Sequence, residues 1–297
     1  MAGEKLKGII VPIVTPFDQG GKLDIEALTK LLDFLIAAGV HGIFPAGTTG
    51  EGPLLTGDER MYLAEKTVEI VAGRVPVIIH TGAVSTQETL DLSKHAKAVG
   101  AQAVAVIPPF YFSYNDKALY KFYSTIATEL EDFPLYLYNN PGVGNANRLS
   151  YELCSSLLKA HHNVVGMKDS SGSVDLLLQL SDEFEGFSAA IGGDGLILMG
   201  SSMGIDAFIS GNANIFPELF VSLYNAASNR EIEKAREIQK KVNQIRRILK
   251  DGGDLSLFKG IMAARGISVG QVRPPLLPAD EADLAKRRQA LSELALL

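Results

Sequence analysis

The sequence contains one cysteine and no tryptophan. A single cysteine excludes any disulfide within the chain, and it also excludes a zinc site built from several thiolates. We expect Cys154 to fill the core from a helix over residues 151–158 rather than to act as a nucleophile. The remaining composition, with 46% hydrophobic and 21% charged residues, is typical of a soluble globular protein.

Long apolar runs and clusters of basic residues are also absent. No run of about 18 apolar residues occurs, and the first residues, Met-Ala-Gly-Glu-Lys-Leu-Lys-Gly, lack the apolar stretch of a signal peptide. The formal net charge of −6 disfavours binding to nucleic acid or to anionic membranes. The sequence therefore predicts a cytoplasmic protein with no nucleic-acid partner and no membrane attachment.

The ligand clusters of metal and nucleotide sites are missing as well. Catalytic metals need histidines and carboxylates gathered in one place, whereas the five histidines are scattered and only His80 lies near a predicted strand end. A nicotinamide or flavin domain would carry a Gly-x-Gly-x-x-Gly turn after its first strand, and here that place holds Thr15-Pro16-Phe17-Asp18. We expect neither a metal nor a cofactor.

Short apolar runs rich in β-branched residues alternate with longer amphipathic stretches, which indicates parallel strands joined by helices. The predicted strands are 8–14, 42–46, 75–80, 103–107, 135–138, 164–167, 188–191 and 207–210. The predicted helices are 25–38, 58–72, 86–99, 116–129, 150–158, 174–184, 196–203 and 217–227. Asp24 and Ser85 are predicted N-caps, with Glu88 answering Ser85 in a capping box. Eight such pairs favour an α/β fold of the (β/α)8 TIM barrel type over an open doubly wound sheet.

The C-terminal part of the chain is predicted to contain helices only. They cover residues 231–249 and 255–264 and a last stretch from Ala279, after a proline-rich joint at 273–278. The spacing is too tight for a free-standing domain, so we expect a helical appendage packed on the barrel. The predicted division is a barrel over residues 1–228 and C-terminal helices over residues 229–297, in one structural unit.

Lys168 lies at the end of an apolar run in residues 163–172, Asn-Val-Val-Gly-Met-Lys-Asp-Ser-Ser-Gly. A buried lysine is partly neutral, because desolvation penalises its charged form, and a neutral amine condenses with carbonyls to form a Schiff base. The alternative is that Lys168 extends from a strand end to solvent or to Asp169. These ten residues alone leave both interpretations open.

Other polar residues follow the predicted strands at the end where active sites of such barrels form. Gly47-Thr-Thr-Gly-Glu-Gly52 offers backbone N–H groups and the hydroxyls of Thr48 and Thr49, which suit a carboxylate or phosphate. Tyr111 follows the fourth strand and Tyr138 ends the fifth. The small-residue loops 192–195 and 209–212 follow the last two strands and leave room for a ligand. Each of these features alone also fits an ordinary turn or aromatic packing.

Four of these segments, in this order, resemble the dihydrodipicolinate synthase / N-acetylneuraminate lyase family of pyruvate-dependent class I aldolases. The likeness extends from the first predicted strand to the Arg273-Pro-Pro275 joint, over nearly the whole chain. The motifs are Gly47-Thr-Thr-Gly-Glu51, Pro109-Phe-Tyr111, Tyr138-Asn-x-Pro141 and Gly166-x-Lys-Asp169.

The resemblance implies a catalytic role for four residues. Lys168 would form the Schiff base with pyruvate or another 2-oxo acid. Tyr138 would shuttle the proton and Thr48 would relay it. Tyr111 would complete the relay, and in relatives this tyrosine often comes from a neighbouring subunit.

The same resemblance implies how the substrates and the subunits are held. Thr48 and Thr49 would bind the pyruvate carboxylate, and Ile209 would line the site with its main chain. The partners would be pyruvate or a 2-oxo acid and an aldehyde, with no cofactor. Members of this family are commonly homotetramers built as dimers of dimers, so we expect the same assembly here.

One position departs from the family pattern. In dihydrodipicolinate synthases an arginine follows the Tyr-Asn-x-Pro motif by two residues and binds the carboxylate of aspartate semialdehyde. Val143 stands there, in Pro141-Gly-Val-Gly-Asn145, and Arg148 would substitute only if the loop folds back. This favours a 2-keto-3-deoxy sugar acid aldolase, which accepts neutral hydroxylated aldehydes, over a dihydrodipicolinate synthase. A larger sugar acid, as in the neuraminate lyases, and a non-catalytic 2-oxo acid sensor remain as further alternatives.

Overall fold

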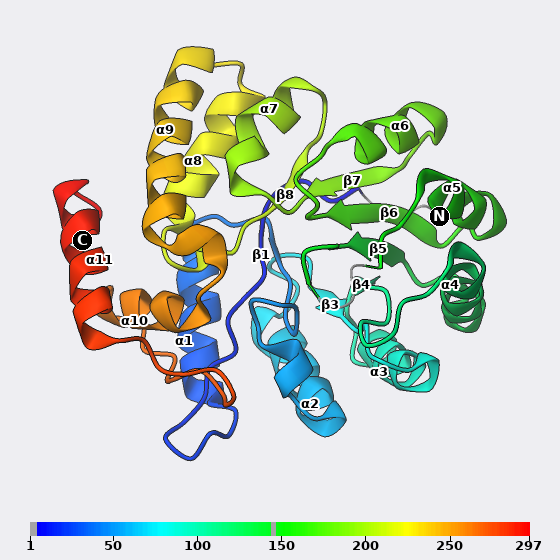
Figure 1. The fold of residues 1–297 in the computed structure, drawn as a ribbon, viewed down its shortest axis with the longest axis horizontal. Coiled ribbons are helices and arrows are strands. Elements are labelled where there is room, and N and C mark those ends of the chain that lie inside the picture. The colour runs from blue at the N-terminus through cyan, green and yellow to red at the C-terminus, as the bar shows by residue number, and fades with distance from the viewer. Residues whose placement is uncertain (1–4, 144–146) are drawn as a thin grey trace.

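A computed structural model describes residues 5–143 and 147–297, so residues 1–4 of the N-terminal stretch and residues 144–146 lie outside the description. The described residues form an eight-stranded parallel sheet in the order β2-β1-β8-β7-β6-β5-β4-β3 (Figure 1). A parallel bridge between Ile43 and Val77 joins its two edges, which confirms the (β/α)8 barrel. The strands are β1 (Gly8–Val11), β2 (Gly42–Ile43), β3 (Ile78–His80), β4 (Ala103–Val106), β5 (Leu135–Asn139), β6 (Val164–Asp169), β7 (Ser188–Ile191) and β8 (Ala207–Ile209).

One helix follows each strand and lies outside the barrel (Figure 1). Asp24 caps the first of them by accepting from the Ala27 N–H at 2.9 Å, as predicted. Ser85 accepts from the Glu88 N–H, and a reciprocal capping box stands instead at Thr56, before the second helix. These helices are α1 (Ile25–Ala37), α2 (Gly57–Val71), α3 (Thr86–Ala98), α4 (Asp116–Leu130), α5 (Tyr151–Ala160), α6 (Asp175–Glu183), α7 (Ile197–Ser202) and α8 (Pro217–Ser228).

The strands are buried on both faces, because alternate side chains point into the barrel and toward the helices. The inner set is a small apolar cluster that includes Ile10, Phe44, Tyr136 and Ile209. The outer set forms the larger core between strands and helices, and Cys154 belongs to it as expected. The interior of the barrel is therefore a packed core, and it supports the residues at the ends of the strands.

Strands β5 and β6 extend further toward the mouth than the sequence predicts. Tyr138 pairs with Lys168 and Asn139 with Asp169, and the Asn139 amide donates to the Asp169 carboxylate at 2.7 Å. This side-chain bond lengthens the ladder beyond the apolar residues that marked the predicted ends. Lys168 consequently lies within a strand rather than after one.

The C-terminal helices α9 (Ile232–Ile248), α10 (Leu255–Ala264) and α11 (Glu281–Glu293) gather on one side of the barrel (Figure 1). Arg265, at the end of α10, forms an ion pair with Glu218 of α8 at 2.9 Å. The last helix begins at Glu281 rather than Ala279, because the Asp280 side chain caps it. Within the described part of the chain, no helix has the length and apolar character needed to cross a membrane.

Candidate active site

A cavity of about 980 Å³ opens at the end of the barrel where the strands terminate. Five of the six residues predicted to form the site line it: Thr48, Thr49, Tyr138, Lys168 and Ile209. They come from the segments that follow or end β2, β5, β6 and β8. Parallel strands end at one face of a barrel, so residues far apart in sequence meet there.

Lys168 points into the barrel mouth and not into bulk water. Only 6% of the residue is exposed, and its Nζ lies 4.0 Å from the centroid of the Tyr138 ring and 4.7 Å from that of Phe44. The neighbouring Asp169 carboxylate accepts from the Asn139 amide and from the Ser171 N–H at 2.6 Å. This placement rules out the extended, solvent-directed alternative for Lys168.

Tyr138 is 2% exposed, and the pKa of its phenol lies below the usual value. Burial, the largest single influence, would raise this pKa, but the positive charge of Lys168 and the hydrogen bonds of the phenol together outweigh it. These hydrogen bonds involve Thr48, Lys168 and Asn140, and the Asn140 amide donates to the phenol oxygen at 3.0 Å. The phenol is therefore easier to ionise than that of a free tyrosine, beside the amine that would react.

The turn that carries Thr48 and Thr49 is held in an unusual backbone shape. Glu51 has a left-handed φ of 55°, which costs free energy for a residue other than glycine. A Cβ on Gly52 would lie 1.9 Å from a backbone oxygen, so only glycine fits there. This shape leaves Thr48 exposed and Thr49 half-buried on the cavity wall.

Tyr111 is the predicted site residue that the fold of one chain does not bring to the cavity. It is 70% exposed, and its ring packs edge-on against Phe112 with the centroids 4.9 Å apart. Tyr111 is not among the described residues that line the cavity. Val143 lines the cavity, whereas Arg148 is exposed and is not among the described residues that line it.

Asp194 and Asn212 also line the cavity, although the sequence predicted no specific role for either residue. The Asn212 amide donates to the Asp194 carboxylate at 2.6 Å. Burial raises the pKa of Asp194 above its usual value, although hydrogen bonds from Asn212 and Ser210 oppose the shift. The available signal was their position, because both stand in the small-residue loops after β7 and β8.

The histidine nearest the site is enclosed by the barrel. His80 ends β3 and is 5% exposed, with Nδ1 3.0 Å from the Ala46 carbonyl oxygen. Burial and then the charge of Arg60 hold the imidazole pKa well below its usual value. Across residues 5–143 and 147–297, no group of three or more histidine, cysteine or acidic side chains is placed to hold a metal ion.

A family model described as the dihydrodipicolinate synthetase family matches residues 5–294. The chain belongs to this family. Its members are lyases and synthases of the class I aldolase type, so the chain is an enzyme of that type. The family assignment confirms the resemblance carried by the four ordered motifs.

Relatives within the dihydrodipicolinate synthetase family carry more than one name. The chain is 37% identical to a DapA-like lyase of Halobacterium salinarum, over 98% of this chain and 95% of the relative. It is 35% identical to a 4-hydroxy-tetrahydrodipicolinate synthase of Methanosphaerula palustris, over 97% and 98%.

Solved structures of the family superpose closely on this fold. YagE, a prophage protein of E. coli K12 crystallised with pyruvate, is 31% identical with a TM-score of 0.93, over 98% of this chain and 99% of that one. Dihydrodipicolinate synthase of Aquifex aeolicus is 31% identical with a TM-score of 0.92, over 98% of both chains.

Proposed function

We propose that this chain is a pyruvate-dependent lyase that forms or cleaves a carbon–carbon bond of a 2-oxo acid through a Schiff base on Lys168. The observation that carries the proposal is the enclosed amine of Lys168, which faces the Tyr138 phenol across adjacent strands. An amine in such a place is shielded from bulk water and has an acid–base partner beside it.

The reaction follows from ordinary imine chemistry. After its ammonium gives up a proton, the amine of Lys168 attacks the ketone carbon of pyruvate. The resulting carbinolamine takes up a proton on its hydroxyl group and loses water to give an iminium. The iminium withdraws electrons, so the adjacent methyl carbon loses a proton and the iminium becomes an enamine. The former methyl carbon of this enamine attacks an aldehyde carbon. Water then releases the product and regenerates the amine, and the reverse sequence cleaves the bond.

The surrounding residues would supply protons and hold the carboxylate. Tyr138 transfers protons to and from the reacting oxygen and carbon, and its lowered pKa makes the phenol a better proton donor than a free tyrosine. Thr48, hydrogen-bonded to the phenol, relays the proton. Thr48 and Thr49 bind the pyruvate carboxylate through N–H and hydroxyl groups, while Ile209 lines the site by its main chain.

The acceptor side favours a neutral, hydroxylated aldehyde, and hence a 2-keto-3-deoxy sugar acid aldolase. Val143 offers no charge to an acceptor carboxylate, and a missing charge-assisted hydrogen bond costs about 1.5–3 kcal/mol. The paired side chains of Asp194 and Asn212 provide hydrogen-bonding groups that suit hydroxyls.

The second candidate is 4-hydroxy-tetrahydrodipicolinate synthase, which would condense pyruvate with aspartate semialdehyde. It is favoured by the 35% identity to a relative of that name over nearly the whole chain. A non-catalytic 2-oxo acid sensor would bind without turnover, and the family's lyase chemistry disfavours it.

We also propose a cytoplasmic homotetramer, a dimer of dimers in which Tyr111 completes the relay of a neighbouring subunit. Tyr111 is 70% exposed and Phe112 is 60% exposed, so this proposal places both at the surface between subunits. Residues 1–228 and 229–297 would act as one structural unit within each subunit.

Borohydride reduction in the presence of pyruvate, followed by intact-mass spectrometry, tests the Schiff base. The wild type should gain a stable adduct, and Lys168→Ala should not. Lys250→Ala is the matched control, because Lys250 lines the rim of the same cavity and pairs with Asp254 and Asp283. An adduct that survives in Lys168→Ala, or no adduct in the wild type, would contradict the proposal.

Screening acceptors with the wild type then separates the two candidate activities. We expect condensation of pyruvate with glyceraldehyde to exceed condensation with aspartate semialdehyde. Preferential turnover of the semialdehyde would assign the synthase activity instead.

A further inference from the structure

Lys259 of α10 and Glu51 of the turn after β2 form a buried ion pair. The Lys259 Nζ lies 2.7 Å from the Glu51 Oε1, and the two side chains are 1% and 0% exposed. The same ammonium donates to the Thr15 carbonyl at 2.8 Å and to the Gln271 carbonyl at 2.9 Å. Two carbonyl oxygens and one carboxylate oxygen thus surround the ammonium.

A buried ion pair is weak evidence for added stability. Removing two charges from water is costly, and well-packed apolar side chains often stabilise a core equally well. Such a pair is better suited to fixing one geometry, because each charge is tolerated only where its partner stands. We therefore infer that Glu51 and Lys259 fix the position of the backbone around them.

Glu51 belongs to the turn that presents Thr48 and Thr49 to the cavity. The Glu51 N–H donates to the Thr48 carbonyl at 3.1 Å, and the Gly52 N–H donates to the Gly47 carbonyl at 3.0 Å. These two bonds close the turn around the threonines. The left-handed φ of Glu51, 55°, persists only where surrounding contacts over-determine it.

Thr15 ties the same turn to Lys259 by a second route. Its hydroxyl donates to the Gly50 carbonyl at 2.5 Å, while its own carbonyl accepts from the Lys259 ammonium. Lys259 therefore reaches the turn both through the Glu51 carboxylate and through Thr15. Both routes cross from a helix near the C-terminus to a turn near the N-terminus.

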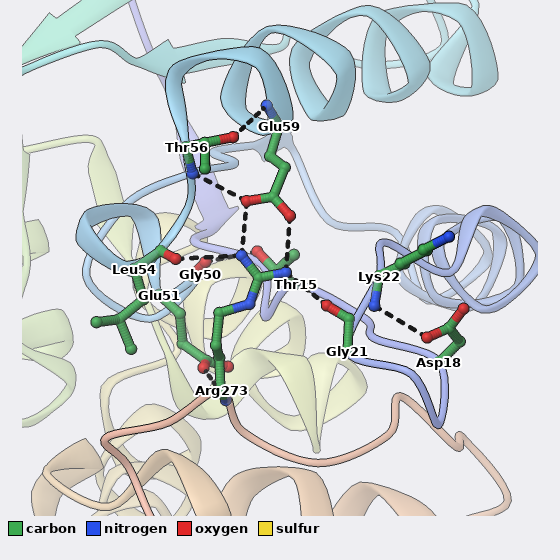
Figure 2. A network of polar contacts seen from close by, with 10 residues as sticks. All are labelled: Thr15, Asp18, Gly21, Lys22, Gly50, Glu51, Leu54, Thr56, Glu59 and Arg273. Carbon is green, nitrogen blue, oxygen red and sulfur yellow. Dashed lines mark hydrogen bonds and ion pairs between the residues drawn. The ribbon is translucent and has the colours of Figure 1, made fainter.

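Arg273 occupies the other oxygen of Glu51 (Figure 2). Its backbone N–H donates to Oε2 at 2.7 Å. Its guanidinium donates to both oxygens of Glu59 at 2.6 and 2.8 Å, and to the Leu54 and Gly21 carbonyls. Each carboxylate oxygen of Glu51 thus has a different partner, and both partners come from the segment that follows α9.

We propose that Glu51 and Lys259 are positioning residues that hold the Thr48–Thr49 turn in the shape that receives the carboxylate of the 2-oxo acid. This inference rests on the proposed function of that turn. Among the described residues, neither Glu51 nor Lys259 belongs to the cavity lining, so both act through the turn and not on the substrate. The C-terminal helix α10 would then help to position the substrate-binding turn.

Lys259→Met and Glu51→Gln test the inference, because each variant removes the charge and keeps a side chain of similar size. The readout is the pyruvate concentration that gives half-maximal borohydride trapping on Lys168, together with the rate at saturating pyruvate. We expect the half-saturating concentration to rise about 10- to 100-fold, as small misplacements of binding groups do. The rate at saturation should fall by a smaller factor than the half-saturating concentration rises, because Lys168 and Tyr138 are untouched and only the relay residue Thr48 moves with the turn.

Arg265→Met is the matched control, because Arg265 also ties α10 to the barrel but through Glu218 of α8 and the Ile215 carbonyl. It should leave the half-saturating pyruvate concentration unchanged. The double variant Glu51→Gln with Lys259→Met removes both charges and leaves no unpaired buried ion, so it keeps the test available if a single variant does not fold. Its shift should be smaller than the product of the two single shifts.

Folded variants that keep the wild-type half-saturating concentration would overturn the inference. So would an equal rise in Arg265→Met, which would indicate a general loosening of α10. Absence of an adduct in the wild type would instead contradict the proposed Schiff base, so the two failures are distinguishable.

Discussion

Tyr138 and Lys168 are register partners on adjacent parallel strands, β5 and β6, with the Lys168 Nζ 4.0 Å from the Tyr138 ring centroid. Their relative position is set by backbone ladder bonds rather than by flexible loops, so the amine and the phenol are held together before any substrate arrives. Such preorganisation is what general acid–base chemistry on an imine requires.

The ionisation of Tyr138 should depend on Lys168. The phenol pKa is lowered in the wild type, against burial, by the charge and hydrogen bond of Lys168. In Lys168→Met burial remains while the charge is lost, so the pKa should rise above the wild-type value. Ultraviolet absorbance of tyrosinate, followed as the pH rises, measures the phenol pKa. The part of the absorbance change that is lost in Tyr138→Phe belongs to Tyr138. An unchanged titration in Lys168→Met would contradict the coupling.

Tyr138→Phe should separate binding from proton transfer. The variant keeps the ring beside Lys168 and removes the hydroxyl, so we expect kcat to fall about 10²- to 10⁴-fold with little change in the KM for pyruvate. Steady-state kinetics on the acceptor found by screening provide the measurement. A purely structural Tyr138 would leave kcat within a fewfold of the wild type.

Val143→Arg should move acceptor preference toward a carboxylate. The new guanidinium would stand on the cavity wall where Val143 now lies, and a charge-assisted hydrogen bond raises kcat/KM for aspartate semialdehyde by about 10- to 150-fold. Val143→Met, which is long but uncharged, is the control and should not show this gain. No change in the ratio of semialdehyde to glyceraldehyde turnover in Val143→Arg would argue against this acceptor subsite.

The Glu59–Arg273 pair should make stability depend on pH on the acid side. Hydrogen bonding by Arg273 is the main cause of the lowered pKa of Glu59. A carboxyl with a folded-state pKa below its unfolded value of about 4.3 stabilises the protein above that value. This contribution is lost as the pH falls through the folded-state pKa.

Glu59→Gln should therefore lower the melting temperature at neutral pH and reduce the further loss on acidification to below pH 4. The expected cost at neutral pH is about 1 kcal/mol. Glu65→Gln is the control, since its carboxylate lies 3.8 Å from Lys66 on the same helix. Equal acid sensitivity of Glu59→Gln and the wild type would show that the pair does not carry this dependence.

The barrel could be predicted because strands buried on both faces have short, nearly continuous apolar sequences. Helix α10 also has the predicted bounds, 255–264. Strand ends were less accurate in both directions. Pairing between neighbours carries β5 and β6 past their predicted ends, whereas β1 ends at Val11 and β2 at Ile43, short of the predicted residues 14 and 46. Local patterns carry no information on such contacts between segments distant in the chain.

For the site as for the fold, local motifs predicted some residues, whereas contacts between distant segments could not be predicted. The motifs placed Thr48 and Lys168 on one cavity, since parallel strands end together. The pairing of Glu51 with Lys259 links two residues from opposite halves of the chain and has no local signature. Tyr111 is 70% exposed and does not line the cavity of one chain, so its role in the proton relay stays a prediction.

Peptide mapping of the wild-type protein after borohydride reduction with pyruvate tests the central claim most directly. We predict that the reduced pyruvyl group is found on the peptide that contains Lys168 and on no other lysine. A modification on a different amine, such as Lys250 at the cavity rim, or an unmodified Lys168 peptide at saturating pyruvate, would contradict the account.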